Sequence, residues 1–319
     1  MRPRVRKKAV VVGLKPDLEP RGSTRNEAYV AENGVYRQAA PPEHRESEYD
    51  SASFDVLLTM QRDHFWYRGR HRFIRFAVQR QLARLRWPED KLAVVDLGGG
   101  CGGWINDCRR SGLLKNAQWA LADSSLKALE LAMQVVGPHV RRYQVDLLDL
   151  KWHDRWDVAF MLDVLEHIPD HGRALRQICQ SLRPGGLLFV TTPALSRFWS
   201  WNDEAAHHQR RYSTADFRRL AHPCGFELLD ARYFMFFLSP LMLAARWSRR
   251  PDLSRMSQDA IAELQARTHR VPPPIVNAPL RAVFSLESPL GHVISFPWGT
   301  SVLAVLRKQP HMGGPKRTG

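Results

Sequence analysis

The sequence is poor in cysteine and contains no long apolar run. Its four cysteines in 319 residues stand at spacings that match neither a zinc site nor a disulfide framework, so we expect free thiols and a cytoplasmic location. The apolar residues 234–245 fall short of the ~20 residues that span a bilayer. Val10-Val11-Val12 is too short for the core of a signal peptide. These absences argue against a disulfide-rich secreted domain and against a membrane-spanning protein.

Acidic residues are scarce relative to basic ones. Asp and Glu total 32 against 47 Lys and Arg, which gives a formal net charge of +15 at pH 7. Such a charge is compatible with nucleic acid or an anionic membrane as a partner. Much of it lies at the two ends of the chain, where basic tails are usually solvated, so nucleic-acid binding is disfavoured. Arg246, Arg249 and Arg250 directly follow residues 234–245, which keeps a peripheral membrane contact open beside a buried helix.

An alternation of apolar runs and amphipathic segments predicts an α/β fold. We expect a seven-stranded, mostly parallel sheet with helices on both faces and a helical cap. The predicted strands are residues 92–97, 117–122, 140–145, 158–162, 187–192, 225–233 and 300–306. The predicted parts are an irregular extension (1–50), leading helices (51–90), a Rossmann-like cofactor-binding core (91–232), a helical cap insertion (233–299), a final core strand (300–308) and a flexible tail (309–319).

A glycine-rich turn follows the first predicted strand of the core. Gly98, Gly100 and Gly103 fit the dinucleotide pattern G-x-G-x-x-G, and Asp123 lies about 20 residues further on, where a ribose-binding acid is expected. These two features fit a nicotinamide-dependent oxidoreductase equally well. The turn alone therefore predicts a nucleotide-like ligand without fixing which one.

Three further features favour a different cofactor. Asp96 stands directly before the turn, which gives D-x-G-x-G-x-G, and Asp146 ends the third strand. The run Asp157 to His167 is followed by Leu182-Arg183-Pro184-Gly185-Gly186 and another strand. In this order the set resembles the class I S-adenosylmethionine-dependent methyltransferases, closest to the ubiquinone-biosynthesis and natural-product enzymes. The resemblance implies a Rossmann-like class I methyltransferase fold and S-adenosyl-L-methionine as cofactor.

The resemblance extends on both sides of the core. His64-Phe65-Trp66-Tyr67-Arg68-Gly69-Arg70 is similar to the aromatic-arginine helix of one subgroup. Residues 203–212 fit that subgroup's stretch D-E-x-x-x-H-x-R-R-Y, with His207 in place of its usual glycine. Residues 296–301 resemble its closing strand.

The resemblance also implies roles for individual residues. In the cofactor site, the glycines would hold the methionine part, Asp96 would orient it, Asp123 would accept from the ribose hydroxyls, and Asp146 with Leu147 would face the adenine. Asp163 and Val164 would line the sulfonium region, and Arg70 would pair with the cofactor carboxylate unless the aromatic segment merely packs the helix. The expected cofactor-binding residues are Asp96, Gly98, Gly100, Gly102, Asp123, Ser124, Asp146, Leu147, Asp163, Val164, Trp66 and Arg70.

An oxygen acceptor must lose a proton, which a histidine suits. His167 and His208 are the candidate catalytic bases. Arg211 and Tyr212 would either bind an anionic acceptor or brace their loop. No metal site is expected, because consecutive side chains such as His207 and His208 point apart in regular structure.

The sequence therefore predicts an S-adenosylmethionine-dependent methyltransferase with a small-molecule or lipid-linked acceptor. Oxygen is the favoured acceptor atom, and nitrogen and carbon remain open. An NAD(P)-dependent oxidoreductase and a catalytically inactive, methyltransferase-like nucleic-acid-binding module remain the alternatives. The sequence does not predict the oligomeric state.

Overall fold

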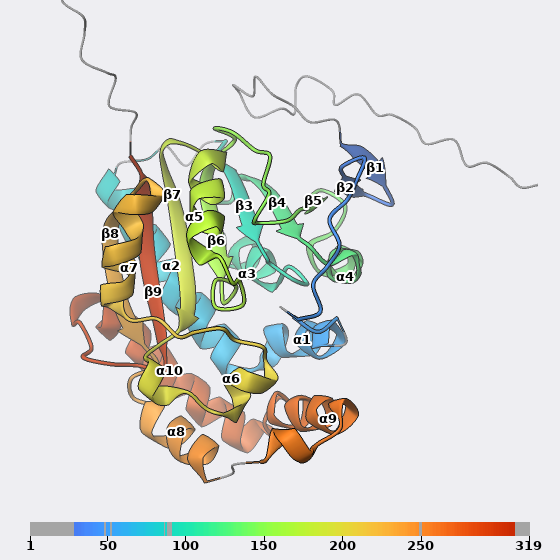
Figure 1. Ribbon diagram of the computed structural model, residues 1–319. Coiled ribbons are helices and arrows are strands. Elements are labelled where there is room, and N and C mark those ends of the chain that lie inside the picture. The colour runs from blue at the N-terminus through green and yellow to red at the C-terminus, as the bar shows by residue number, and fades with distance from the viewer. Residues whose placement is uncertain are drawn as a thin grey trace, which may run out of the picture.

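One mixed sheet organises the molecule (Figure 1). The computed structural model describes residues 29–309, except for residues 48, 52, 86, 88–90, 249 and 250. Residues 1–28 of the predicted extension (1–50) and residues 310–319 of the predicted tail (309–319) lie outside this range. The described strands are β1 (Val30–Glu32), β2 (Val35–Arg37), β3 (Ala93–Leu97), β4 (Gln118–Asp123), β5 (Arg141–Gln144), β6 (Trp156–Leu162), β7 (Leu182–Pro193), β8 (Phe226–Phe234) and β9 (Ser301–Lys308).

The strand order is β1-β2-β5-β4-β3-β6-β7-β9-β8. Strands β5, β4, β3, β6 and β7 are parallel to their neighbours, whereas β9 runs antiparallel to both β7 and β8. The carboxyl ends of the parallel strands therefore lie along one edge of the sheet, where α/β proteins bind ligands. The mixed α/β sheet predicted from the sequence is confirmed.

The strand count is nine rather than the predicted seven, because a hairpin extends the sheet within the segment expected to be irregular. Strands β1 and β2 pair antiparallel, and β2 pairs parallel with β5. Asn33 and Gly34 form the turn with φ values of 51° and 76°, as a two-residue hairpin requires. Arg142 on β5 donates to the Asn33 carbonyl at 3.2 Å. The Asn-Gly pair between two short β-prone runs is the sequence signal of this hairpin.

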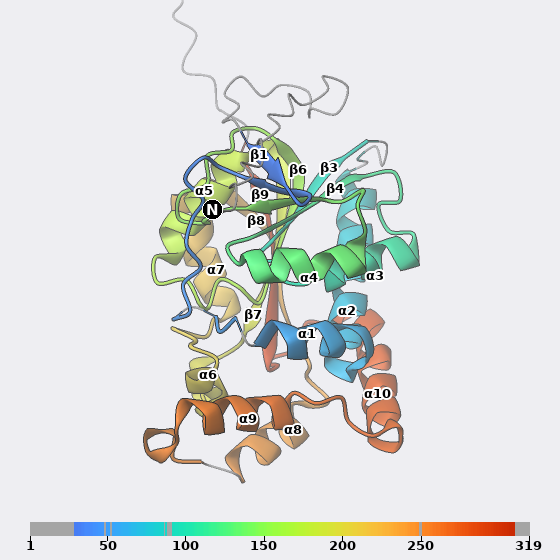
Figure 2. The same ribbon diagram turned by 90° about the vertical axis from the view of Figure 1, so that its right-hand side faces the viewer.

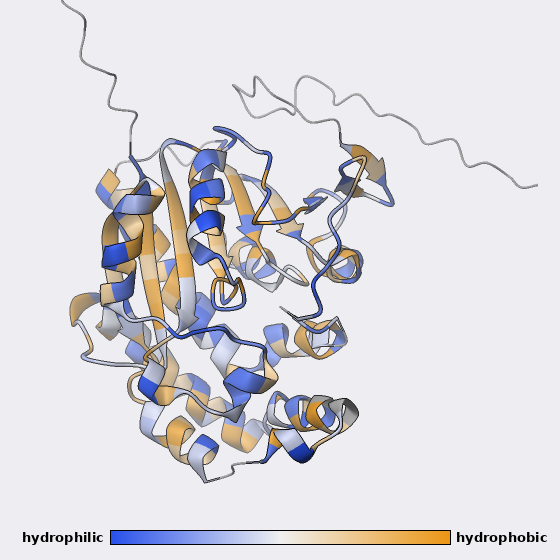
Figure 3. Cartoon of the chain, in the orientation of Figure 1, coloured by the Kyte–Doolittle hydropathy of each residue, from blue (hydrophilic) through white to orange (hydrophobic). Residues whose placement is uncertain are grey.

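Helices cover both faces of the sheet (Figure 2). Because side chains alternate along a strand, Val95 on β3 joins the cluster under α5 and α7, whereas Val94 packs with Phe160 toward α2 and α3. Hydrophobic residues are concentrated along the central strands (Figure 3). The helices of the two faces are α2 (Phe65–Leu85), α3 (Gly103–Ser111) and α4 (Leu126–Val136) on one side and α5 (His171–Ser181) and α7 (Thr214–Ala221) on the other.

A set of helices lies below the carboxyl edge of the sheet in Figure 1. It comprises α1 (Ser53–Asp63), α6 (Trp201–Ala205), and α8 (Ser239–Trp247), α9 (Gln258–Thr268) and α10 (Pro274–Val293) from the segment between β8 and β9. Short 3-10 helices occupy Ser196–Phe198, His222–Cys224 and Leu253–Arg255. Buried Glu287 on α10 accepts from the Phe236 and Phe237 amides at 3.0 Å each, which ties this helix to the loop that precedes α8.

Helix α10 packs closely on α2. At their contact, a Cβ added to Gly69 would lie 2.0 Å from Cδ1 of buried Phe284. Only glycine fits there, because both helices are held by the core around them. None of the helices in the described part of the chain is both long enough and apolar enough to cross a membrane.

Replacing Gly69 with Ala should therefore destabilise the protein by roughly 1–3 kcal/mol, because the added methyl group overpacks the contact. Gly172→Ala on α5 is the matched control, since its nearest neighbour is the far end of the Arg176 side chain at 3.3 Å. That control should be neutral or stabilising by up to about 1 kcal/mol. Denaturant unfolding measures both variants. Equal stabilities of the two would contradict the packing described here.

Candidate functional site

A cavity of about 1090 Å³, its open mouth included, lies at the carboxyl edge of the parallel strands. Its lining comes from the ends of β3 to β6, from α1 and α2, and from the segment that follows β2. A cavity of this size can hold a nucleotide-sized ligand. Eleven side chains or glycines expected from the sequence line it, namely Arg70, Asp96, Gly98, Gly100, Asp123, Ser124, Asp146, Leu147, Asp163, Val164 and His167.

Asp96 forms the floor of the cavity. Its side chain is 1% exposed, and neither carboxylate oxygen accepts a hydrogen bond from a described residue. A Cβ at Gly99 would lie 2.5 Å from Oδ2 of Asp96, so only glycine leaves room for the carboxylate beneath the turn. Burial raises the pKa of Asp96 to about 8, with Arg70 opposing and Asp123 adding to the shift. A ligand that brings a cationic donor would satisfy this carboxylate.

Asp123, at the end of β4, holds the glycine turn in place. Its Oδ2 accepts from the Gly100 amide at 3.0 Å and its Oδ1 accepts from the Ser125 amide at 2.9 Å. Burial raises the pKa of Asp123, while these amides oppose the shift. The carboxylate lines the cavity, so it also offers lone pairs to the hydroxyl groups of a ligand.

The segment after β2 forms part of the cavity lining through His44, Arg45 and Tyr49. This contribution was not among the predictions from the sequence. Arg45 donates to both oxygens of Asp146 at 2.5 and 3.3 Å, and His44 hydrogen-bonds the Ser124 hydroxyl at 2.8 Å. Asp146, expected to face an adenine, is therefore also the anchor of this segment. Tyr49 from the same segment lines the cavity, and burial raises the pKa of its hydroxyl. No local pattern in the sequence marks these contacts, because they join residues about 80 to 100 positions apart.

Arg70 on α2 reaches into the cavity and forms an ion pair with Asp163. Its guanidinium lies over the rings of Trp66 and Tyr67, at 4.8 and 4.9 Å from their centroids. Its buried Nε has no acceptor among the described residues, so it remains a donor for a ligand. Trp66 and Gly102, both expected at the cofactor, do not line the cavity, since Trp66 packs against the core and Gly102 turns toward Val136 at the start of α3.

Two histidines meet beside the cavity, one of which lines it. His167 is part of the cavity wall, whereas His208 does not line the cavity. The centroids of the two imidazole rings are 4.7 Å apart. His208 Nδ1 and Asp203 Oδ1 are 2.9 Å apart. Burial alone would raise the pKa of Asp203, but hydrogen bonds from His208 and Arg211 hold it well below its ordinary range. Asp203 thus accepts from Nδ1–H of His208. In the neutral ring, the second nitrogen, Nε2, then carries the lone pair.

Arg211 and Tyr212 do not reach the cavity, contrary to the expected role in binding an acceptor. Arg211 donates to both oxygens of Asp203 at 2.8 and 2.9 Å, and its side chain is 2% exposed. The Tyr212 hydroxyl lies 2.7 Å from Nδ1 of His171 and is likewise buried. Both residues brace their loop, which is the other role that the sequence left open. Residue type suggested anion binding, but burial next to Asp203 satisfies the arginine internally.

Comparison with known proteins decides the family. A model of the methyltransferase domain matches residues 65–231, more than half of the chain. The chain belongs to the methyltransferase-domain family. It is a class I S-adenosylmethionine-dependent methyltransferase domain, and S-adenosylmethionine is its cofactor, as the resemblance implied. The unpartnered Asp96 fits the ammonium group of that cofactor, and the buried Nε of Arg70 fits its carboxylate.

Curated relatives resemble only part of the chain. A trans-aconitate 2-methyltransferase of Deinococcus radiodurans is 32% identical over 130 residues, which is 40% of this chain and 46% of the relative. A ubiquinone biosynthesis O-methyltransferase of Caulobacter vibrioides is 29% identical over 118 residues, which is 34% and 43%. The chain therefore spans about half the length of the curated relatives it matches.

Solved structures share the fold at low identity. The [4+2]-cyclase SpnF has a TM-score of 0.53 at 17% identity, over 86% of this chain and 98% of that one. A chain of the Haloferax volcanii complex between the Trm112 methyltransferase activator and its partner has a TM-score of 0.51 at 16% identity, over 84% and 99%. These matches support the fold alone.

The raised pKa of Asp96 makes cofactor binding depend on pH. A bound ammonium group favours the carboxylate and lowers its pKa, so binding below pH 8 releases a proton. Affinity for S-adenosylhomocysteine should therefore rise from pH 6 to pH 8, by up to about tenfold per pH unit. Calorimetry at each pH measures it.

Asp96→Asn should bind more weakly and show no such rise, whereas the exposed control Asp149→Asn should behave as the wild type. Wild-type affinity that stays constant over this range would show that Asp96 does not face the ammonium group.

Proposed function

We propose that this protein transfers the methyl group of S-adenosylmethionine to an oxygen of a small-molecule or lipid-linked acceptor. The observation that carries the proposal is the placement of Asp96 and His167 on different walls of one cavity. Asp96 offers an acceptor to the amino-acid part of the cofactor, and His167 offers a ring nitrogen to a substrate. The two groups are what cofactor binding and removal of an acceptor proton require.

The cofactor, when bound, supplies an activated methyl group on a cationic sulfur. The protein then has to align the acceptor with that methyl group and keep water away. Tyr49 and Tyr67 line the cavity and are buried enough that the pKa of each is raised, to about 12 for Tyr67. The two tyrosine hydroxyls therefore stay uncharged at neutral pH and place no negative charge in the cavity. His167, in the wall of the cavity, would take the hydroxyl proton of an acceptor held toward that methyl group.

The choice of oxygen as the acceptor atom is supported by the ubiquinone biosynthesis O-methyltransferases among the relatives. A lipid-linked acceptor and a peripheral membrane contact are supported by exposed apolar residues on the cap. On α10 they recur at helical spacing, and on α8 Leu241 is 57% exposed. The exposed large apolar residues of α10 are Ile275, Val276, Val283, Leu286, Leu290 and Val293.

Catalysis has to be tested directly, because the shared fold of the cyclase SpnF shows that this architecture does not fix the reaction. Purified protein should bind S-adenosylhomocysteine in calorimetry and fail to bind NADH. Incubation with isotope-labelled cofactor and a cell extract, with and without anionic vesicles, should yield a labelled product whose mass identifies the acceptor.

His167→Ala should slow this methyl transfer by about 10²–10⁴-fold, since it removes the group that takes the proton. Its affinity for S-adenosylhomocysteine should stay close to that of the wild type. The exposed His139→Ala is the control and should keep full activity. Binding of NADH alone would refute the proposal, and a salt-dependent gel shift without cofactor binding would favour a nucleic-acid-binding module.

A further inference from the structure

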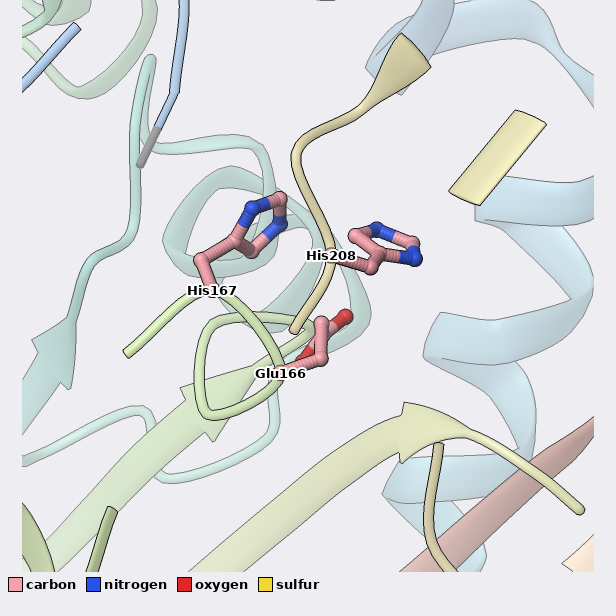
Figure 4. Close-up of side chains that lie close together, drawn as sticks. All are labelled: Glu166, His167 and His208. Atoms are coloured by element: carbon pink, nitrogen blue, oxygen red, sulfur yellow. The ribbon is translucent and has the colours of Figure 1, made fainter. Parts of the chain in front are cut away.

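Three metal-ligating side chains gather beside the cavity (Figure 4). Glu166 and His167 lie on the loop after β6, and His208 lies on the loop after α6, far away in the sequence. One ligand atom from each residue lies within 4.8 Å of the other two. The two imidazole rings are steeply inclined to each other, at 83°. The three groups therefore surround one common space.

Glu166 is the member of this group that calls for a cation. It is 0% exposed, and neither carboxylate oxygen accepts a hydrogen bond from another described residue. No described lysine or arginine forms an ion pair with it, because Arg70 pairs with Asp163 and Arg211 pairs with Asp203. A buried carboxylate without a partner is strongly unfavourable unless it binds a proton or a cation.

His208 is oriented as a metal ligand commonly is. Its Nδ1 is held by Asp203, which is itself 1% exposed and bound by Arg211 on both oxygens. Metal-binding histidines usually donate their other ring N–H to a carboxylate in this way, which fixes the tautomer and the ring orientation. Asp203 on α6, held by Arg211, thus fixes the His208 ring so that its other nitrogen, Nε2, is available to the common space.

We propose that Glu166, His167 and His208 bind a divalent first-row transition metal ion at the wall of the cofactor cavity. Two nitrogen ligands and one carboxylate suit Zn²⁺, Co²⁺ or Fe²⁺ and disfavour Mg²⁺ and Ca²⁺, which take oxygen ligands. Three protein ligands leave coordination positions open. The sequence predicted no metal site, since it considered the adjacent pair of histidines rather than residues from separate loops.

An ion bound there would lie next to the cavity, because His167 is part of the cavity wall. A hydroxyl group bound to such an ion loses its proton more readily. This role in acceptor activation rests on the proposed function, whereas binding of the ion does not. In protein that holds the ion, His167 and His208 would bind the ion, and the ion would promote loss of the acceptor proton. Neither histidine would then act as the base itself.

The test uses the full chain after treatment with a chelator and removal of that chelator. Zn²⁺ titration is followed by calorimetry, and Co²⁺ binding is followed by visible absorption. The wild type should bind one equivalent, with Co²⁺ bands that indicate nitrogen ligands. Glu166→Gln and His208→Asn should each weaken Zn²⁺ binding by about 100-fold or more. The control is His207→Asn, at an exposed neighbouring position with a φ of 56° that asparagine tolerates. This variant should bind Zn²⁺ as tightly as the wild type.

Circular dichroism and binding of S-adenosylhomocysteine, each measured without metal, show that the variants are folded. Wild-type protein that fails to bind Zn²⁺ below millimolar concentration would overturn the proposal, as would Glu166→Gln and His208→Asn binding as tightly as His207→Asn. If the wild type binds Zn²⁺ but does not bind S-adenosylhomocysteine, that result would contradict the proposed function and would not contradict the metal site.

Discussion

The arrangement of the site depends on a carboxylate, Asp96, that is buried without a partner beneath a glycine turn. Gly99 must lack a side chain to leave room for it, and Asp123 fixes the same turn by accepting from the Gly100 amide. Both acids stand at the ends of neighbouring parallel strands, so the sheet itself brings them to one edge. Burial raises the pKa of Asp96 to about 8, so the acid is protonated at lower pH, and a ligand with a cationic group favours its ionised form.

A second buried carboxylate, Glu166, lies next to the cavity-lining His167 and has different surroundings. Asp96 is flanked by glycine and backbone, which suits an organic cofactor, whereas Glu166 is flanked by two imidazoles, which suits a metal ion. Arg70 lines the cavity and forms an ion pair with Asp163. Under the two proposals above, the methyl donor would bind at Asp96, and the cluster of Glu166, His167 and His208 would act on the acceptor.

Local sequence signals predicted the fold and the cofactor end of the site. Strand β3, which contains Asp96, and the glycine turn after it each involve residues within a few positions of one another. Contacts between distant segments could not be predicted in this way. Arg45 reaches Asp146 across about 100 residues. The two roles left open for Arg211 could not be separated, because residue type does not reveal that buried Asp203 already accepts from it.

The most direct test of the central claim is a crystal structure of the protein with S-adenosylhomocysteine. We predict that the ligand fills the cavity at the carboxyl edge, with its ammonium group hydrogen-bonded to Asp96 directly or through one water molecule and its ribose hydroxyls at Asp123. A ligand bound elsewhere, or one whose amino-acid end leaves Asp96 without a donor, would contradict this account.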